Sequence, residues 1–313
     1  IALNLRWATS EMNGFAALRV GFRSPEPVDL MDRAVAAAAA ADVAVVMVGT
    51  NDEWETEGFD RTTMDLPGRQ NELVRRVVAA NPRTAVIVNA GSPVTMDWAD
   101  AADANSARAV LTSFFAGQEQ AESLVDVLLG VADPGGRLPT TIPVRLADHP
   151  AYLHHRPDHD SAGNGTQAYG EGLFIGYRGY DARNIAPRFA FGHGLSYGSA
   201  TWGEAVVTSE SADGITVEVR VAATGSRVAT VVVQGYIAAI DAPCIRPPKE
   251  LKTWDKFVVE PGASHVAQLE FPRSAFRRWD TATGGWIVDA GDYELVIAAS
   301  ATDIRQRLRV TLA

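Results

Sequence analysis

The sequence predicts an α/β protein with a parallel sheet in its first half, followed by an all-β sandwich. In the first half, apolar runs of strand length alternate with amphipathic helical segments, which is the pattern of parallel strands joined by helices. After Trp202 the apolar positions recur with a period of two, as in strands that turn one face to a core. A chain of 313 residues is long enough for two domains.

The expected elements of the first half follow one another closely. Two prolines, Pro25 and Pro27, precede a helix from Asp29 to about Ala41. The apolar run Val43–Val48 predicts a parallel strand that is buried on both faces. The later segments predict a helix at 68–80, a strand at 84–89, a short helix near 98–103, a strand at 107–115, a helix at 117–130 and a short strand at 137–142.

The segments before and after this pattern lack its alternation of strands and helices. Residues 1–23 alternate loosely around Asn13-Gly14 and predict two strands, which are marginal alone and are expected to complete a β domain encoded upstream. The stretch 149–197 has little periodicity and is expected to be a long ordered connection, functional or clamped to a neighbour. Beyond it, strands are predicted at 215–221, 228–237, 265–271, 293–298 and 307–312.

The charge balance excludes several classes of partner. The formal net charge is −10 and the pI is about 5.1, which argues against nucleic acid and against an anionic membrane surface. No apolar run approaches the roughly 18 residues of a membrane span. Cys244 is the only cysteine, so an intrachain disulfide is impossible. The compartment stays open, with secretion slightly favoured over the cytoplasm.

The loop after the first apolar run holds most of the candidate chemistry. Between Asn51 and Arg61 it contains three glutamates, a tryptophan and an aspartate, at a point where a strand delivers side chains to the edge of a sheet. Glycosidic bond cleavage needs two carboxyl groups, of which one donates a proton. On the residues alone, Glu53, Glu55 and Glu57 are close to equivalent, and a solvated acidic loop is the plainer interpretation.

Five segments, in order and in register, resemble glycoside hydrolase family 3. They are Glu53–Arg61 with Asp65-Leu66-Pro67-Gly68, then 134–141 (PGGRLPTT), 171–178 (EGLFIGYR), 189–197 (FAFGHGLSY) and Lys249-Glu250-Leu251. The resemblance implies an α/β sandwich domain at 28–150, a connecting segment at 151–200 and a fibronectin type III-like domain at 201–313. Residues 1–27 resemble the C-terminal end of a carbohydrate-binding β insert of some members.

The family resemblance also implies a partner and an activity. In the family, an N-terminal (β/α)8 barrel carries the nucleophilic aspartate, and nothing in this chain resembles that barrel. We therefore expect the barrel of the same polypeptide as partner, and an inactive chain without it. The implied activity is that of a retaining, exo-acting β-glycosidase, foremost a β-glucosidase that removes terminal β-D-glucosyl residues without metal or cofactor. The alternatives are a non-catalytic carbohydrate-binding module, a β-xylosidase or a macrolide-glycoside β-glucosidase; a homo-oligomer stays open.

Glu53 is the predicted general acid/base, and Glu57 is the next candidate. Glu53 lies nearest the strand end, and the resemblance favours it too. Trp54 is expected to offer a stacking face to the sugar, and Glu57, Asp60 and Arg61 to hold the loop's shape. The histidines at 149, 154, 155 and 159 are expected to line a loop packed on the barrel rather than to bind a metal. Tryptophans 254, 279 and 286 are assigned to the sandwich core or rim, with a sugar platform left open for Trp286.

Overall fold

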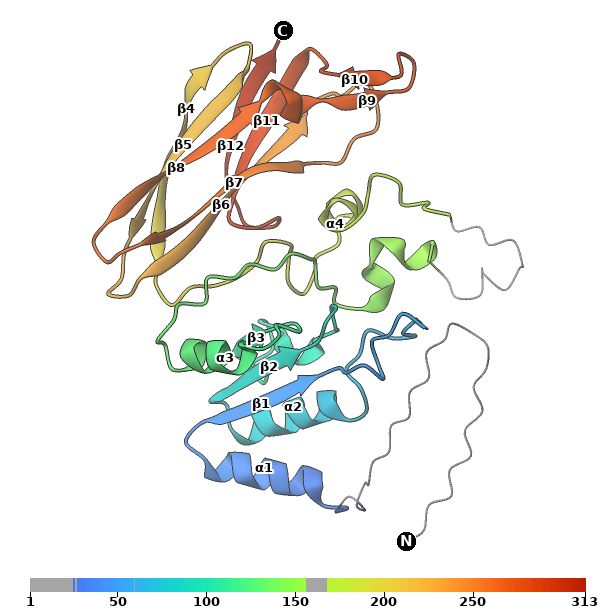
Figure 1. Cartoon of the computed structure of the whole chain (residues 1–313), viewed down its shortest axis with the longest axis vertical. Coiled ribbons are helices and arrows are strands. Elements are labelled where there is room, and N and C mark those ends of the chain that lie inside the picture. The colour runs from blue at the N-terminus through green and yellow to red at the C-terminus, as the bar shows by residue number, and fades with distance from the viewer. Residues whose placement is uncertain (1–24, 26, 59, 156–167) are drawn as a thin grey trace.

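The structure is a computed structural model that describes residues 25, 27–58, 60–155 and 168–313. The two strands predicted within residues 1–23, and almost all of the insert-like segment 1–27, lie outside these residues. The α/β part occupies one end of the molecule and the β-sandwich the other, with the connecting segment between them (Figure 1). None of the helices in the described ranges has the length and apolarity to cross a bilayer.

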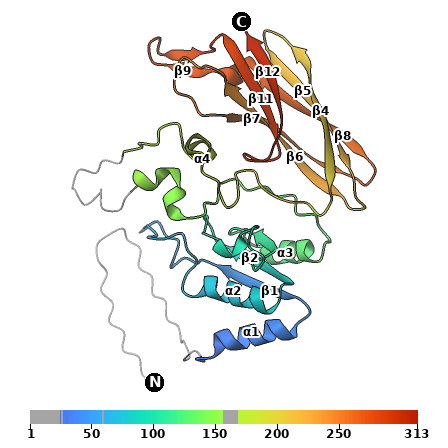
Figure 2. The ribbon, with the colours of Figure 1, turned by 180° about the vertical axis from the view of Figure 1, so that it is seen from behind.

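The first half forms the predicted parallel sheet. Its strands lie in the order β1 (Ala44–Gly49), β2 (Thr84–Asn89) and β3 (Ala109–Thr112), with Val46 opposite Val86 and Val86 opposite Val110. Helices α1 (Leu30–Ala40) and α2 (Gln70–Ala80) lie together on one side of the sheet in both ribbon views (Figures 1 and 2). Apolar residues of α2 and of the strands form one core: Val74, Val77 and Val78 with Val46, Val48, Val86 and Val88.

The expectation that the first strand is buried on both faces is wrong. Val46 and Val48 are buried, but Val45 and Met47 are 55% and 59% exposed. β1 is an edge strand, and α1 and α2 cover only one of its faces. Helix α3 (Gln120–Leu128) contributes no buried residue, and Leu129 just after it is 74% exposed. We call the pair Val45 and Met47 the open face of β1.

Two predicted elements of this half differ from the structure. The segment 137–142 is not a strand: its one β-bridge joins Ile142 to Phe189, and Leu138 exchanges backbone hydrogen bonds with 192–193. Pro139 and Pro143 lie on either side of Ile142 and lack the backbone N–H groups that a ladder of strand hydrogen bonds requires. The helix expected near 98–103 is a single 3₁₀ turn, η1 (Asp97–Ala99).

The connecting segment contains ordered structure that the periodicity did not show. One 3₁₀ turn, η2 (Leu146–Asp148), lies just before the segment, a second one, η3 (Pro150–Leu153), lies at its start, and a short helix, α4 (Tyr177–Arg183), follows. The helix ends at Asn184, which adopts a left-handed conformation with φ of 51°. Seven residues give too few turns for an apolar period to appear in the sequence.

The second half is the predicted antiparallel sandwich. One sheet has the order β12-β11-β6-β7 and the other β4-β5-β8. Strands β4 and β7 were not predicted, because their apolar and polar residues do not alternate cleanly in the sequence. A separate hairpin joins β9 to β10. The bounds are β4 (Ala200–Glu210), β5 (Gly214–Ala223), β6 (Ala229–Ala239), β7 (Glu250–Val259), β8 (Ser264–Pro272), β9 (Arg278–Asp280), β10 (Gly285–Ile287), β11 (Gly291–Ala298) and β12 (Ile304–Leu312).

The connecting segment is fixed to the sandwich through α4. Tyr177 stacks on Phe191 with ring centroids 5.1 Å apart, and its hydroxyl oxygen accepts a hydrogen bond from the backbone N–H of Leu251 (2.8 Å). Asp181 and Lys249 form an ion pair whose side chains are 15% and 7% exposed. Segments 171–178, 189–197 and 249–251 therefore meet in one place, which we call the junction.

Asp133 forms a second link between the two halves. Its carboxylate accepts hydrogen bonds from the hydroxyl of Ser196 (2.9 Å) and from the backbone N–H groups of Tyr197 (2.7 Å) and Thr230 (3.2 Å). Burial alone would raise the pKa of Asp133, but these hydrogen bonds outweigh burial and lower it. The carboxylate is thus ionised and joins the α/β part to β6.

Candidate active site

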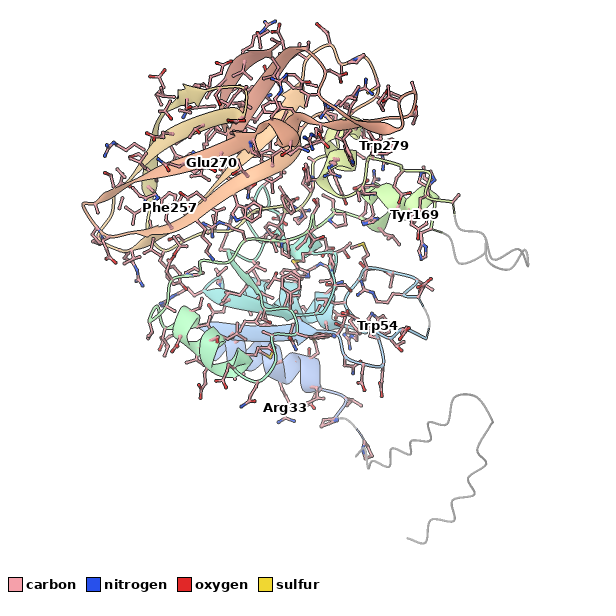
Figure 3. All side chains as sticks on the ribbon, turned by 45° about the horizontal axis from the view of Figure 1, so that its top comes forward. Arg33, Trp54, Tyr169, Phe257, Glu270 and Trp279 are labelled. Carbon is pink, nitrogen blue, oxygen red and sulfur yellow. The ribbon has the colours of Figure 1, made fainter. Side chains whose placement is uncertain are left out.

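The loop 51–61 leaves the carboxyl end of β1, and the segments after β2 and β3 leave the same edge of the sheet. In open parallel sheets, ligands bind at the carboxyl ends of the strands. The loop projects from one side of the molecule, where Figure 3 shows Trp54. Local sequence therefore places the predicted site residues at the edge where a parallel sheet ordinarily carries its chemistry.

Glu55, the middle of the three glutamates, is the anchor of the loop. Its carboxylate accepts hydrogen bonds from Ser92 Oγ (3.0 Å) and from the backbone N–H of Gly91 (3.0 Å), and a short one from the hydroxyl of Thr50. Arg61 Nη1 lies 3.9 Å from Glu55 Oε1, and Arg61 Nη2 donates to the carbonyl of Pro93 (3.1 Å). One carboxylate thus ties the loop after β1 to the segment after β2.

These contacts keep Glu55 ionised. Partial burial on its own would raise the pKa, but the hydrogen bonds from Thr50 and Ser92, the charge of Arg61 and the Gly91 N–H together lower it below its ordinary value. A group that donates a proton to a leaving oxygen must hold one at working pH. The contacts of Glu55 and its lowered pKa thus suit an anchoring role better than that of a proton donor.

Gly91 leaves room for this anchor. A Cβ atom at position 91 would lie 2.7 Å from Glu55 Oε2 and 2.8 Å from the ring of Phe115. Both contacts are shorter than side-chain carbon atoms tolerate. The glycine thus allows the carboxylate and the half-exposed ring of Phe115 to approach the same backbone.

Glu53 lies in a tight turn directly after β1. Asn51 builds this turn, because its carbonyl accepts from the N–H groups of Trp54 (3.0 Å) and Glu55 (2.8 Å), and its side-chain oxygen accepts from the N–H of Glu53 (3.1 Å). The Glu53 residue itself is exposed. The backbone is thus well fixed next to the strand end, while the carboxyl group is accessible.

Glu57 lies further out on the loop. The residue is exposed, and its carboxylate has neither a hydrogen bond nor an ion pair with any residue in the described ranges. The following Gly58 donates its N–H to Thr56 Oγ1 (3.2 Å), which shapes the turn. The structure therefore gives the loop two accessible glutamates, Glu53 and Glu57, on either side of the anchored one.

Trp54 is half-buried beside these carboxyl groups. Its indole Nε1 is inaccessible to solvent and has no hydrogen-bond partner among the residues that the structure describes. A buried donor without a partner is uncommon in folded proteins. The residue as a whole is intermediate in burial, so part of it remains accessible at the loop.

Among the histidines at 149, 154, 155 and 159, His155 contacts the loop. His155 Nε2 is 3.2 Å from Asp60 Oδ2, with both side chains largely exposed. His149 accepts from the N–H of Ala151 (3.3 Å), and burial lowers its pKa. Within the described ranges, no group of three or more His, Cys, Asp or Glu side chains could hold a metal ion. His159 lies outside those ranges.

Sequence reasoning missed the partners of Glu55. The tripeptide Gly91-Ser92-Pro93 lacks the Gly-x-Ser-x-Gly pattern of a serine-hydrolase nucleophile elbow. The structure gives Ser92 a different task, as a hydrogen-bond donor to the anchor carboxylate. The one available signal was position: Thr50 and Ser92 each follow closely on a parallel strand, at the same edge.

The family comparisons match both halves of the chain. Residues 6–177 match the Glycosyl hydrolase family 3 C-terminal domain, and residues 231–301 match the Fibronectin type III-like domain. A β-glucosidase of Rhizobium radiobacter is 40% identical over 298 residues, which are 95% of this chain and 36% of that protein. The order of domains is thus shared with a relative along nearly the whole chain.

Solved structures agree with the sequence matches. The β-glucosidase of Kluyveromyces marxianus in complex with glucose superimposes with a TM-score of 0.84 at 34% identity, covering 93% of this chain and 34% of that one. DesR, a β-glucosidase from Streptomyces venezuelae in complex with D-glucose, gives 0.79 at 33% identity, covering 90% and 35%. The chain spans about one third of the length of these relatives. It belongs to glycoside hydrolase family 3, as a C-terminal portion in which the family's α/β domain precedes a fibronectin type III-like domain.

Proposed function

We propose that the protein containing this chain removes terminal β-D-glucosyl residues with retention of configuration. The observation that carries the proposal is the loop 51–61: one ionised glutamate anchors it at the carboxyl edge of the sheet, and two accessible glutamates flank the anchor. Membership of the family and relatives named β-glucosidases support the substrate class. No metal or cofactor takes part in the proposed steps.

We assign the general acid/base to Glu53, with Glu57 as the rival. The group would protonate the oxygen of the leaving group in the first step and remove a proton from water in the second. Glu53 is favoured by its rigid turn next to β1, which fixes the distance to a substrate. Glu57 is favoured by having no partner among the described residues. Trp54 would pack against the sugar or its aglycone.

The second carboxylate, a nucleophilic aspartate, is proposed to come from a barrel in the remaining two thirds of the polypeptide. An accessible loop and the open face of β1, Val45 and Met47, suit a chain that packs against a further domain. Contact with that domain would bring Glu53 or Glu57 within reach of the leaving oxygen that a proton donor must protonate. In this arrangement residues 28–150 provide half of the site, and residues 201–313 support them.

Paired variants of the full-length enzyme test the assignment. Glu53→Gln and Glu57→Gln are compared on aryl β-glucosides with a poor and a good leaving group, with and without azide. The acid/base variant should lose about 10²–10⁴-fold on the poor leaving group. It should lose less on the activated substrate, and azide should restore turnover and yield a β-glucosyl azide.

The outcomes distinguish the candidates. Rescue of Glu53→Gln alone supports the assignment, and rescue of Glu57→Gln alone moves the role to Glu57. Near wild-type activity of both variants would remove the loop from the mechanism. The 313-residue chain, assayed without the rest of the polypeptide, should show no turnover; measurable hydrolysis would contradict the divided site.

A further inference from the structure

The hairpin β9–β10 carries two exposed tryptophans that no step above uses. It belongs to neither sheet of the sandwich. Trp279 lies directly opposite Trp286 in the strand register, with ring centroids 5.6 Å apart and ring planes at 80°. The two residues are 51% and 63% exposed, so of the two places predicted for them, the sandwich core or its rim, the core is excluded. Two neighbouring indoles thus lie on one outer surface of a small hairpin.

The opposite side of the hairpin is fixed by ion pairs. Arg278 donates two hydrogen bonds to Asp289, from Nε (2.7 Å) and Nη2 (2.9 Å), and one to Asp280 (3.1 Å). Thr283 caps the same Asp280 through its N–H (3.0 Å) and hydroxyl (2.7 Å). Because side chains alternate along a strand, Trp279 points away from this network. These contacts fix the backbone of the hairpin, and the indole rings take no part in them.

The surroundings of the pair favour a sugar over a protein partner. Indole offers a broad apolar face and one hydrogen-bond donor, which suits a ring with an apolar C–H face and polar edges. The turn of the hairpin, residues 281–284, supplies two threonines and no large apolar side chain. A protein-binding hot spot would instead lie near the centre of a larger patch whose surrounding contacts exclude water.

The hairpin also lies on the side of the molecule that carries the candidate active site. In both ribbon views the β9–β10 hairpin and the loop after β1 project from the same side (Figures 1 and 2). Figure 3 shows Trp279, Tyr169 and Trp54 along this side. A long glycan bound at the hairpin would thus lie on the surface that leads to the loop.

We propose that Trp279 and Trp286 form a binding site for a pyranose ring of a β-linked glucan. The exposed face of one indole would stack on the C–H face of the sugar, and the second indole, at right angles, would border it. The hydroxyl groups of the sugar would reach the polar turn 281–284. The site is separate from the catalytic loop and does not depend on which glutamate donates the proton.

Native gel electrophoresis of the full-length enzyme, with and without a soluble mixed-linkage β-glucan in the gel, tests the site. Glucose at saturating concentration occupies the active site throughout. The glucan should retard the wild type. Trp279→Ala and Trp286→Ala should each reduce the retardation, and the double variant should abolish it. The aromatic replacements Trp279→Tyr and Trp286→Tyr should retain part of it, which separates stacking from loss of the hairpin.

Trp254→Ala is the matched control, because Trp254 is equally exposed (64%) but lies alone on β7. It should be retarded like the wild type. Hydrolysis of a small aryl β-glucoside should be unchanged in every variant, which keeps this test apart from that of the catalytic loop. An unretarded wild type, or a double variant retarded as strongly as the wild type, overturns the proposal. Equal loss in Trp254→Ala also overturns it.

Discussion

Ser92 Oγ lies 3.0 Å from Glu55 Oε2, so a residue just after β2 holds a carboxylate of the loop after β1. Ser92→Ala removes this donor, and one hydrogen bond to a partly buried charge contributes on the order of 1–2 kcal/mol. We expect a matching fall in the free energy of unfolding, measured by urea denaturation, and a several-fold fall in kcat. Thr56→Ala on the same loop, which loses only a local contact to Gly58, is the control and should be near neutral. An unchanged stability of Ser92→Ala would contradict the anchor.

The lowered pKa of Glu55 makes this anchor dependent on pH. A carboxyl group whose pKa is lower in the folded state stabilises the fold above the unfolded value, near 4.5, and loses that contribution as the pH falls through the folded value. The difference in free energy of unfolding between wild type and Glu55→Gln should therefore be largest near neutral pH and shrink below pH about 4.5. Denaturation curves at a series of pH values measure it, and a difference independent of pH would argue against an ionised Glu55.

Gly91→Ala should disturb the same anchor by steric contact. The new Cβ would lie under 3 Å from Glu55 and Phe115, and overpacking of this kind costs roughly 1–3 kcal/mol. We expect a lower melting temperature and reduced activity of the full-length enzyme. Gly136→Ala is the matched control, since nothing lies within 4 Å of its Cβ position. A melting temperature of Gly91→Ala as high as that of Gly136→Ala would show that the site tolerates the extra atom.

The buried pair at the junction should couple the two halves in stability. Lys249→Met leaves Asp181 without its partner, and such a loss costs roughly 3–5 kcal/mol. The double variant Lys249→Met/Asp181→Leu should recover much of it, because no unpaired charge remains. The exposed pair Arg305–Asp303 is the control, and breaking it should cost at most about 1 kcal/mol. Calorimetry of the wild type and of these variants measures the costs, and equal costs for the two pairs would contradict the burial argument.

A charge introduced on the open face of β1 should be favourable in the 313-residue chain and unfavourable in the full-length enzyme. In the 313-residue chain, Met47→Lys should reduce self-association, because it places a charge on an exposed apolar edge strand. In the full-length enzyme, where we propose that a further domain covers this face, it should lower the melting temperature. Val258→Lys on β7, with 56% exposure, should be neutral in both. Light scattering and thermal denaturation measure the two effects.

Much of the fold was predictable, because a strand with a strong pattern of apolar residues can be recognised from its own sequence. Residues 44–48 of the run at 43–48 and the whole alternation at 215–221 lie in strands of the structure. The two faces of β1 were not predictable, since a continuous apolar run does not say whether both sides are covered. Nor was the failure of 137–142 to form a strand, which depends on the segment around Phe189.

The position of the candidate loop at the edge of the sheet was predictable, but the contacts that distinguish its three glutamates were not. Sequence reasoning found the loop and treated Glu53, Glu55 and Glu57 as near equals. What distinguishes Glu55 is a set of donors, among them Gly91 and Ser92, more than thirty residues away in the chain. Spacing along one loop carries no information on such contacts, so the anchor emerged only when the strands were placed side by side.

The junction bears on how such proteins can change during evolution. Asp133 and Asp181 lie before the β-sandwich in sequence, but their partners, Thr230 and Lys249, lie within it. A recombination event that exchanged only the sandwich for one with different residues at these positions would leave two carboxylates without their contacts. The two halves are therefore expected to be inherited together, with a breakpoint tolerated more readily upstream of α1 than between them.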